Sequence, residues 1–326
     1  MNRRSLRIAA AVIAIASFAI TCQEISAKQL FWADGGIKRA NLDGTSITPL
    51  VNHPVGRFAI ADNKSTVYYG GLDVRKLTPQ TGDDSFLFDV PDYSIFSSIA
   101  IDPIRSNLYI VEAMSSTIFR TDLDGANAAT VIPGDGQFTN TTRIEHVQID
   151  PLGGKLYWSQ YTPPYPPTKS FRRSNLDGSQ QELLFNVSDY IMDFAVEPIS
   201  GRIYWTSSQG WPNSGAVWRA NYDGSNREQI ASGLWGPYAL ALDAEQGKVY
   251  FSDSWTSGPT AYDNTLRVAN LDGSDPRILI NFGPMDGAYD LSIGDLVPEP
   301  ASAGLATTAW FALFACRRRS RPPGRL

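Results

Sequence analysis

A short aromatic and apolar phrase recurs six times along the chain, and this repetition constrains the fold more than any other feature. The six copies are Leu30-Phe31-Trp32-Ala33-Asp34, Val67-Tyr68-Tyr69-Gly70, Leu108-Tyr109-Ile110-Val111, Leu156-Tyr157-Trp158-Ser159, Ile203-Tyr204-Trp205-Thr206 and Val249-Tyr250-Phe251-Ser252-Asp253. The second positions of successive copies are 37, 41, 48, 47 and 46 residues apart. A period of roughly 40–50 residues is typical of one four-stranded blade of a β-propeller.

Each repeat supplies three further strands around the aromatic one. A second strand ends in an Asp-Gly turn in five copies, at Asp43-Gly44, Asp124-Gly125, Asp177-Gly178, Asp223-Gly224 and Asp272-Gly273, and at Thr81-Gly82 in the second copy. Such a turn predicts a hairpin, because glycine adopts positive φ at little cost. Another strand follows each turn, and a short apolar strand precedes the aromatic one from the second copy on, at Phe58–Ala61, Ile99–Pro103, Val147–Pro151, Phe194–Pro198 and Leu240–Asp243.

These patterns predict an all-β fold over residues 28–296, a six-bladed β-propeller of four-stranded antiparallel blades. The first repeat opens directly on its aromatic strand and so lacks an inner strand. The segment Gly287–Ile293 resembles the missing strand and has no aromatic strand after it. We therefore expect this segment to complete the first blade and close the ring, which removes exposed sheet edges.

The repeat resembles the YWTD repeat of the low-density lipoprotein receptor class, also called the class B repeat. Tyr204-Trp205-Thr206 keeps three of the four letters, and Asp34 and Asp253 keep the acid in the first and last copies. The Leu-Asp-Gly turn and the arginine before it match in most copies. The resemblance covers essentially residues 29–293 and implies a six-bladed propeller.

The N-terminal segment, residues 1–27, has the order of a secretory signal peptide. Three arginines precede an apolar run from Ile8 to Ile20, and small residues follow at Ser26 and Ala27. This order predicts export with cleavage after Ala27. Cys22 raises the alternative of a lipoprotein cleavage site, which the preceding residues match less well.

The C-terminal segment, residues 297–326, contains three elements in a fixed order. The motif Pro298-Glu299-Pro300 precedes an uncharged run, Ala301–Cys316, and the cluster Arg317, Arg318 and Arg319 follows it. As a helix the run would be about 24 Å long, slightly short of a bilayer core of roughly 30 Å. Arginines after a membrane helix favour a cytoplasmic end. The tail resembles the PEP-CTERM sorting signal, which implies processing by an exosortase in a bacterial inner membrane and delivery to the cell envelope, surface or extracellular matrix.

The charge distribution and the scarcity of cysteine and histidine exclude several classes of function. Residues 28–296 carry 20 basic and 31 acidic residues, a net charge of −11. Nucleic-acid binding relies on Lys and Arg that neutralise phosphates, so no nucleic-acid partner is expected. Two cysteines and two histidines in the whole chain exclude a zinc framework and a disulfide scaffold.

Aromatic residues concentrate in loops that should open on one face of the propeller. In an antiparallel meander, the loop after the second strand and the loop into the next blade share a face, and the Asp-Gly hairpins lie on the other. We predict a patch over blades four to six that binds a protein or a glycan, since such residues are favoured at interfaces and stack on sugars. Its members are Tyr161, Tyr165, Trp211, Trp235, Tyr238, Trp255 and Tyr262.

Signals of catalysis are weaker than signals of binding. His53 and His146 each precede a predicted inner strand and are interpreted as structural or exposed, and the acids Asp62, Asp102, Asp150, Glu197 and Asp243 recur at one blade position, which favours a role in turns. No nucleophile elbow, P-loop or dinucleotide fingerprint is present, and no cofactor is expected. The first hypothesis is therefore a non-enzymatic binding or scaffolding module. The alternative is a propeller enzyme of the lactonase or lyase type, with a metal or an acid-base pair in the central channel.

Overall fold

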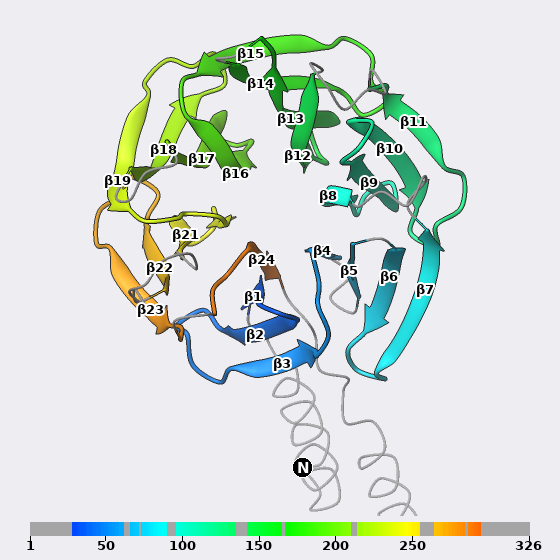
Figure 1. The fold of residues 1–326 in the computed structure, drawn as a ribbon, viewed down its shortest axis with the longest axis horizontal. Helices are drawn as coiled ribbons and strands as arrows, with labels where there is room; N and C mark the ends of the chain where they lie inside the picture. The colour runs from blue at the N-terminus through cyan, green and yellow to red at the C-terminus, as the bar shows by residue number, and fades with distance from the viewer. Residues whose placement is uncertain are drawn as a thin grey trace, which may run out of the picture. The chain divides into compact units, whose positions relative to one another are not determined.

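The computed structural model describes residues 28–61, 66–71, 73–89, 96–134, 142–164, 167–209, 214–254, 264–283 and 286–294. Their regular elements are strands, which form six four-stranded antiparallel sheets arranged in a ring (Figure 1). The predicted six-bladed propeller is therefore confirmed. Within the described residues, no helical segment has the length and apolarity that crossing a bilayer requires.

The blades are numbered from 1 to 6 by their aromatic strand, and each contributes an inner strand to the central channel. The inner strands of blades 1 to 6 are β24 (Asp290–Gly294), β4 (Arg57–Ile60), β8 (Phe96–Asp102), β12 (Arg143–Asp150), β16 (Tyr190–Glu197) and β20 (Leu240–Asp243). The aromatic strands beside them are β1 (Gln29–Ala33), β5 (Val67–Gly70), β9 (Asn107–Glu112), β13 (Lys155–Thr162), β17 (Arg202–Ser208) and β21 (Lys248–Asp253).

Two more strands extend each blade toward the rim of the ring. The third strands are β2 (Ile37–Asn41), β6 (Asp73–Thr78), β10 (Thr117–Asp122), β14 (Thr168–Asn175), β18 (Gly215–Asn221) and β22 (Thr265–Asn270). The outer strands are β3 (Thr48–Val51), β7 (Asp83–Asp89), β11 (Ala129–Ile132), β15 (Glu182–Val187), β19 (Glu228–Leu234) and β23 (Arg277–Asn281).

The ring closes where the late strand β24 pairs with β1. The pairing is antiparallel, with Leu30 opposite Ile293 and Trp32 opposite Leu291, and Figure 1 shows the two strands side by side. Lys28 adds an ionic link to blade 6, because its Nζ lies 2.7 Å from both Asp243 Oδ1 and Glu245 Oε2. The predicted closure by the segment before residue 294 is confirmed.

Large aromatic side chains fill the spaces between neighbouring blades. Trp32, Trp158 and Trp205 are each at most 2 % exposed. Between blades 4 and 5, the Trp205 ring lies 5.4 Å from Phe171 and 5.8 Å from Phe185, measured between centroids. This packing explains why the aromatic strand recurs, since every blade needs bulky apolar groups to bury its face against the next.

Tyrosines of the aromatic strands also link one blade to the turn of the next. The Tyr68 hydroxyl donates to the Leu123 carbonyl at 3.1 Å, and the Tyr109 hydroxyl donates to the Leu176 carbonyl at 3.2 Å. Both acceptors lie in the Leu-Asp-Gly turn of the following blade. The middle blades are therefore joined by hydrogen bonds as well as by apolar packing.

The glycine of the Asp-Gly hairpin is required by conformation and by space. Gly178 has φ +83°, and a Cβ at this position would lie 2.1 Å from the Val131 carbonyl oxygen on the outer strand of the preceding blade. The aspartate before it caps the turn, because the Asp177 carboxylate accepts from the Ser179 amide at 2.9 Å. These hydrogen bonds from Ser179 hold the pKa of Asp177 below its usual value.

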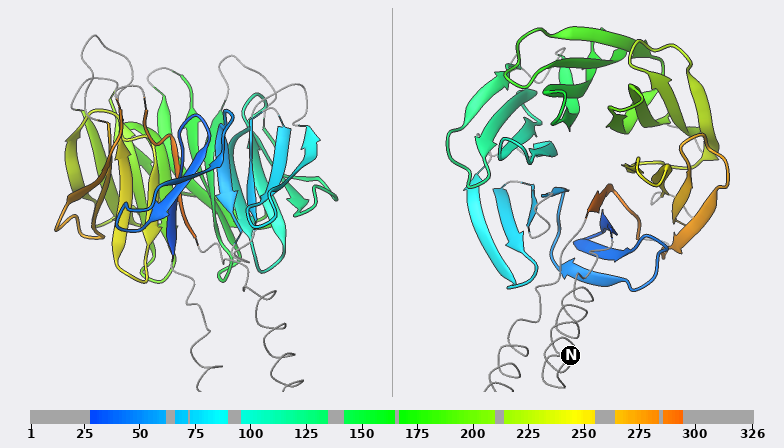
Figure 2. Two further views of the ribbon diagram at one scale, coloured as in Figure 1. Left: turned by 90° about the horizontal axis from the view of Figure 1, so that it is seen from below. Right: turned by 180° about the vertical axis from the view of Figure 1, so that it is seen from behind.

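The connecting segments gather on two opposite faces. Figure 2 shows in side view that the strands run through the thickness of the ring. We call the face where the inner strands begin the mouth face; it carries the connections between blades and the loops between second and third strands. The opposite hairpin face carries the Asp-Gly hairpins and the turns between the inner and aromatic strands.

Candidate functional site

The predicted aromatic residues are only partly covered by the described structure. Tyr161, Trp235 and Tyr238 lie within it, and all three are partly exposed. Tyr165, Trp211, Trp255 and Tyr262 lie outside the described residues, as do the sorting residues Pro298, Glu299, Pro300, Arg317, Arg318 and Arg319. The aromatic patch therefore stays a prediction, with three of its seven members placed.

Tyr161 lies at the end of strand β13 rather than in a loop. Its ring stacks on Tyr190, the first residue of β16, with 6.0 Å between centroids and 19° between planes. The Lys169 Nζ lies 4.2 Å from the centroid of the Tyr190 ring and donates to the Ser188 carbonyl at 2.7 Å. Stacking and the cation–π contact thus fix Tyr190, which remains 38 % exposed at the start of an inner strand.

The loop that carries Trp235 and Tyr238 is held from below by blade 6. The Asp253 carboxylate accepts from the amides of Trp235 at 2.7 Å and Gly236 at 3.2 Å. The Ser252 hydroxyl accepts from the Tyr238 amide at 3.2 Å. Asp253 is the acid of the last YWTD-like copy, so here the repeat residue positions a loop of the mouth face.

The mouth of the central channel contains an open pocket with a volume of about 460 Å³. Tyr190 and Tyr238 line it together with Arg57, Arg143 and Glu145. Burial raises the pKa of the Glu145 carboxyl, against the opposing influence of Arg143 and Arg57. The predicted aromatic residues thus meet charged side chains that the sequence analysis did not single out.

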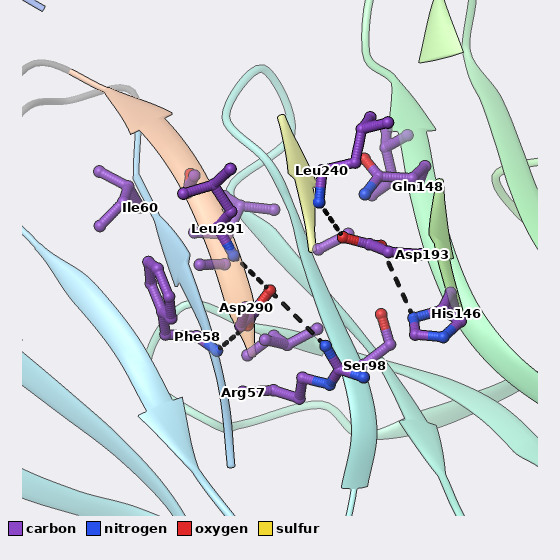
Figure 3. Close-up of a pocket in the computed structure, with 16 residues that line it drawn as sticks. Arg57, Phe58, Ile60, Ser98, His146, Gln148, Asp193, Leu240, Asp290 and Leu291 are labelled. Atoms are coloured by element: carbon purple, nitrogen blue, oxygen red, sulfur yellow. Dashed lines mark hydrogen bonds and ion pairs between the residues drawn. The ribbon is translucent and has the colours of Figure 1, made fainter. Parts of the chain in front are cut away.

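A layer of unlike residues crosses the channel just below this mouth. Each member lies opposite the same position of the aromatic strand in its own blade. In ring order these positions are Ala33, Gly70, Val111, Ser159, Thr206 and Ser252, so the six members are equivalent. In ring order from blade 1 to blade 6 they are Asp290, Arg57, Ser98, His146, Asp193 and Ala239. All except Ala239 line a cavity of about 170 Å³ (Figure 3).

The polar residues of blades 1, 3 and 5 in this layer hold the next blade by its backbone. Asp290 accepts from the Phe58 amide at 2.8 Å, Ser98 accepts from the Val147 amide at 3.1 Å, and Asp193 accepts from the Leu240 amide at 2.8 Å. Each donor is the residue after the layer position in the following blade. A second backbone amide donates to each carboxylate, from Leu291 to Asp290 and from Phe194 to Asp193.

Burial shifts the protonation equilibria of this layer. It raises the pKa of Asp193 to about 7, an effect that Arg57 opposes and Asp290 reinforces. It also raises the pKa of Asp290 and lowers that of His146 well below its usual value. The 3.7 Å between His146 Nδ1 and Asp193 Oδ1 is longer than a hydrogen bond. We conclude that a neutral imidazole contacts the carboxyl group, with no ion pair between them.

Arg57 is the positive charge of the layer. Its Nη1 donates to the Tyr289 carbonyl at 3.0 Å and lies 3.8 Å from Asp290 Oδ1. Figure 3 shows the guanidinium pointing into the space between Asp290, Ser98 and His146. This arrangement can bind polar ligand groups at the base of the mouth, while the carboxylates are engaged by backbone amides.

The two histidines have different environments. His53 is exposed on the surface beside Tyr69, with 5.6 Å between ring centroids. His146 lies within an inner strand, because β12 begins at Arg143 and not at Val147 as the sequence pattern predicted. Aligning the inner strands by the recurring acid would have found four of the six layer members, since Ser98, His146, Asp193 and Ala239 lie four residues before Asp102, Asp150, Glu197 and Asp243.

The recurring acids cap the turns that follow the inner strands, as the sequence predicted. Asp102 accepts from the Ile104 amide at 3.0 Å, and Glu197 accepts from the Ile199 amide at 3.0 Å. Asp150 accepts from the Gly153 amide at 2.8 Å. Asp62 lies outside the described residues. Among the residues that the structure describes, no three His, Cys, Asp or Glu side chains gather in a way that could hold a metal ion.

Comparisons with known proteins support a YWTD-type propeller. No protein-family profile matches the chain. A human low-density lipoprotein receptor-related protein 5-like protein is 27 % identical over 179 residues, which is 54 % of this chain and 66 % of that protein. The chain therefore spans just under two thirds of the length of this curated relative.

Solved structures with the same architecture include proteins of distant sequence. A chain of a nidogen/laminin complex superposes with a TM-score of 0.67 at 16 % identity, covering 82 % of this chain and 99 % of that one. A putative TolB from Agrobacterium tumefaciens gives a TM-score of 0.59 at 14 % identity, covering 80 % of this chain and 91 % of that one. The chain is thus a six-bladed propeller whose repeats are similar to those of a low-density lipoprotein receptor-related protein.

Proposed function

We propose that this chain is an exported binding or scaffolding propeller that recognises a protein or a glycan through its mouth face. The observation that carries the proposal is the concave mouth, where Tyr190 and Tyr238 lie beside Arg57, Arg143 and Glu145. Aromatic and arginine side chains are the residue types that dominate binding energy at interfaces. Both tyrosines are held by their surroundings, so a partner would meet a preorganised surface.

The comparisons supply independent support for a binding role. One structural neighbour is a chain of a complex between nidogen and laminin, so a propeller-like chain of this size takes part in an assembly of two proteins. The human relative is a receptor-related protein by its name. The partner of this chain is inferred as a class, a protein or a glycan.

We also propose that the two ends direct the propeller to the cell envelope, surface or extracellular matrix of a bacterium. The signal-peptide pattern of residues 1–27 and the Pro-Glu-Pro, apolar and arginine pattern of residues 297–326 support this destination. An exosortase-type enzyme would process the tail, and the membrane would be contacted through the apolar run before processing.

The lactonase or lyase alternative is not favoured. Its strongest support is the layer of Arg57, His146, Asp193 and Asp290 around a cavity of about 170 Å³. Asp193 and Asp290 each already accept hydrogen bonds from two backbone amides, one of which belongs to the next blade. Such bonding is expected of side chains that hold neighbouring blades together. The layer therefore has an explanation in ring stability that needs no reaction.

The binding proposal is tested by a double substitution at the mouth, Tyr190→Ala with Tyr238→Ala. Glycan and surface-protein arrays probed with the purified protein should give hits that weaken by about tenfold or more in the variant, the loss expected for two interface anchors. The matched control is Ile47→Ala, which changes a residue that is 49 % exposed between β2 and β3 on the hairpin face. Hits that the double variant retains at full strength would contradict the mouth as the binding surface.

A further inference from the structure

Three apolar side chains project from the hairpin face at equivalent positions of adjacent blades. Ile104, Leu152 and Ile199 are 55 %, 90 % and 95 % exposed. Each lies two residues after the recurring acid, in the turn between the inner and aromatic strands of blades 3, 4 and 5. Scattered apolar residues are ordinary on a protein surface, but these three occupy the same turn position in three neighbouring blades, and we call them the arc.

These turns are rigid supports for the apolar residues. A proline precedes each apolar residue, and the buried acid accepts amide hydrogens from within the turn. Asp102 also pairs with Arg105, whose Nη1 lies 3.0 Å away and donates to the Pro151 carbonyl of the next blade. The side chains are therefore presented outward in a fixed geometry, so little conformational entropy would be lost on burial.

The chain leaves the propeller on this same face. Gly294 lies four residues after Asp290, just as Asp102, Asp150 and Glu197 lie four residues after the layer members Ser98, His146 and Asp193. Strand β24 therefore ends at the level where the turns of blades 3, 4 and 5 begin. Blade 1, in which β24 ends, lies on the opposite side of the ring from blade 4.

The tail keeps this face close to whatever holds the apolar run. Six residues, 295–300, separate Gly294 from the start of the run at Ala301. Fully extended, they span at most about 20 Å. An anchor in a bilayer at blade 1 would thus leave the arc of blades 3 to 5 within reach of the same bilayer.

We propose that, before the tail is processed, the hairpin face docks on a lipid bilayer, with the arc of Ile104, Leu152 and Ile199 inserted between lipid headgroups while the C-terminal tail holds blade 1. The proposal rests on the membrane tail inferred above. A bilayer fits better than a second copy of the chain, because three separate side chains can each insert between lipids, whereas ionised hairpin aspartates on the same face would oppose an identical face. Hydrogen bonds in their turns lower the pKa of these aspartates, Asp43, Asp177, Asp223 and Asp272.

The same aspartates specify the lipid. The four aspartates oppose anionic headgroups, and Arg105 beside Ile104 is already paired with Asp102. Docking should therefore depend on apolar insertion and favour zwitterionic lipid. Added salt should not release the face from phosphatidylcholine, since apolar contacts are not screened. These two expectations separate insertion from electrostatic adsorption.

The test places an environment-sensitive fluorophore at one tip of the arc in the full chain. Both native cysteines, Cys22 and Cys316, lie in the end segments, so Leu152→Cys in a Cys22→Ser, Cys316→Ser background gives one labelling site. In phosphatidylcholine vesicles the label should shift its emission to the blue and be quenched by brominated lipid. A label at Asn52→Cys, an exposed residue between strands β3 and β4, should do neither. The variants Ile104→Ser and Ile199→Ser together should reduce the shift at position 152.

The possible failures of this test are distinguishable. Protein that does not float with the vesicles would overturn the membrane tail and the docked face together. Protein that floats with the 152 label in water would overturn the docked face alone and leave the tail intact. A blue shift that disappears when protein is diluted at constant lipid would show a second copy as the occupant. Equal shifts at positions 52 and 152 would also refute a specific face.

Discussion

Replacing the buried carboxyl of the channel layer should change how stability depends on pH. Asp193 is 6 % exposed and sits between Arg57, His146 and Asp290, and burial raises its pKa to about 7 from the value of 3.8 that is ordinary for an aspartate. Between these two values the folded chain holds a proton that the unfolded chain has released. Stability must therefore fall as pH rises through this window and level off above pH 7.

The magnitude follows from the size of the shift. One pKa unit corresponds to about 1.4 kcal/mol, and partial ionisation near pH 7 reduces the effect at the upper end. Between about pH 5 and pH 7 the Asp193 carboxyl should lower the free energy of unfolding by about 2 kcal/mol. Asp193→Asn removes this dependence, because an amide does not ionise in that range.

Urea unfolding followed by tryptophan fluorescence at about pH 5, 6 and 7 measures the effect as a difference between two curves. Asparagine can accept only one of the two backbone amides that Asp193 satisfies, so the variant should be less stable overall. The informative quantity is the loss between pH 5 and 7, which should be smaller in the variant. The control is Asp275→Asn, an exposed residue paired with Arg277, which should keep the dependence of the unchanged protein. Parallel curves for Asp193→Asn and the unchanged protein would refute the reasoning.

Two further substitutions test the ring itself by the same unfolding assay. Gly178→Ala combines φ +83° with a Cβ 2.1 Å from a backbone oxygen, whereas Gly82→Ala has φ +75° and open space around the new Cβ. Gly82→Ala should therefore lower the free energy of unfolding by about 1–2 kcal/mol, and Gly178→Ala should lower it by about 1–3 kcal/mol more. Equal losses in the two variants would show that the blade contact at Gly178 relaxes freely. Leu291→Ala removes a 6 % exposed side chain opposite Trp32 at the closure and should cost about 2–5 kcal/mol; a loss below about 1 kcal/mol would mean that β24 contributes little to holding the ring.

The fold could be predicted from sequence because it depends on residues that repeat. Trp32, Trp158 and Trp205 occupy the same place in three blades, and the glycines of the Asp-Gly hairpins meet the same steric requirement in five blades. A requirement met several times leaves several copies of its signature. The closure by β24 was also predictable, since one inner strand was missing at the start and one was unaccompanied at the end.

The channel layer could not be predicted in the same way, because its members differ. Arg57 lies one residue before the predicted strand Phe58–Ala61, and Asp290 lies inside the predicted segment Gly287–Ile293 with no recurring acid after it to mark its level. His146 was assigned to the approach of an inner strand that in fact includes it. The recurring acid marks this level in blades 3 to 6, but only the register between inner and aromatic strands shows that Arg57 and Asp290 share it.

The inner strands bring both candidate surfaces to positions where the blades are free to differ. Within a blade, aromatic and hairpin positions must fit the neighbouring blade, so they are nearly alike around the ring. The inner strands have the channel on one side. Fewer packing demands therefore act on the layer residues near the mouth face and on the turn residues at the hairpin face. At the layer the six blades supply five kinds of side chain, and at the turns blades 3 to 5 supply Ile104, Leu152 and Ile199 where blade 6 supplies Glu245. The backbone hydrogen bonds of Asp290, Ser98 and Asp193 account for part of the layer. Ring packing does not require partly exposed tyrosines at the mouth or exposed apolar residues at the turns, which supports binding at the mouth and docking at the arc.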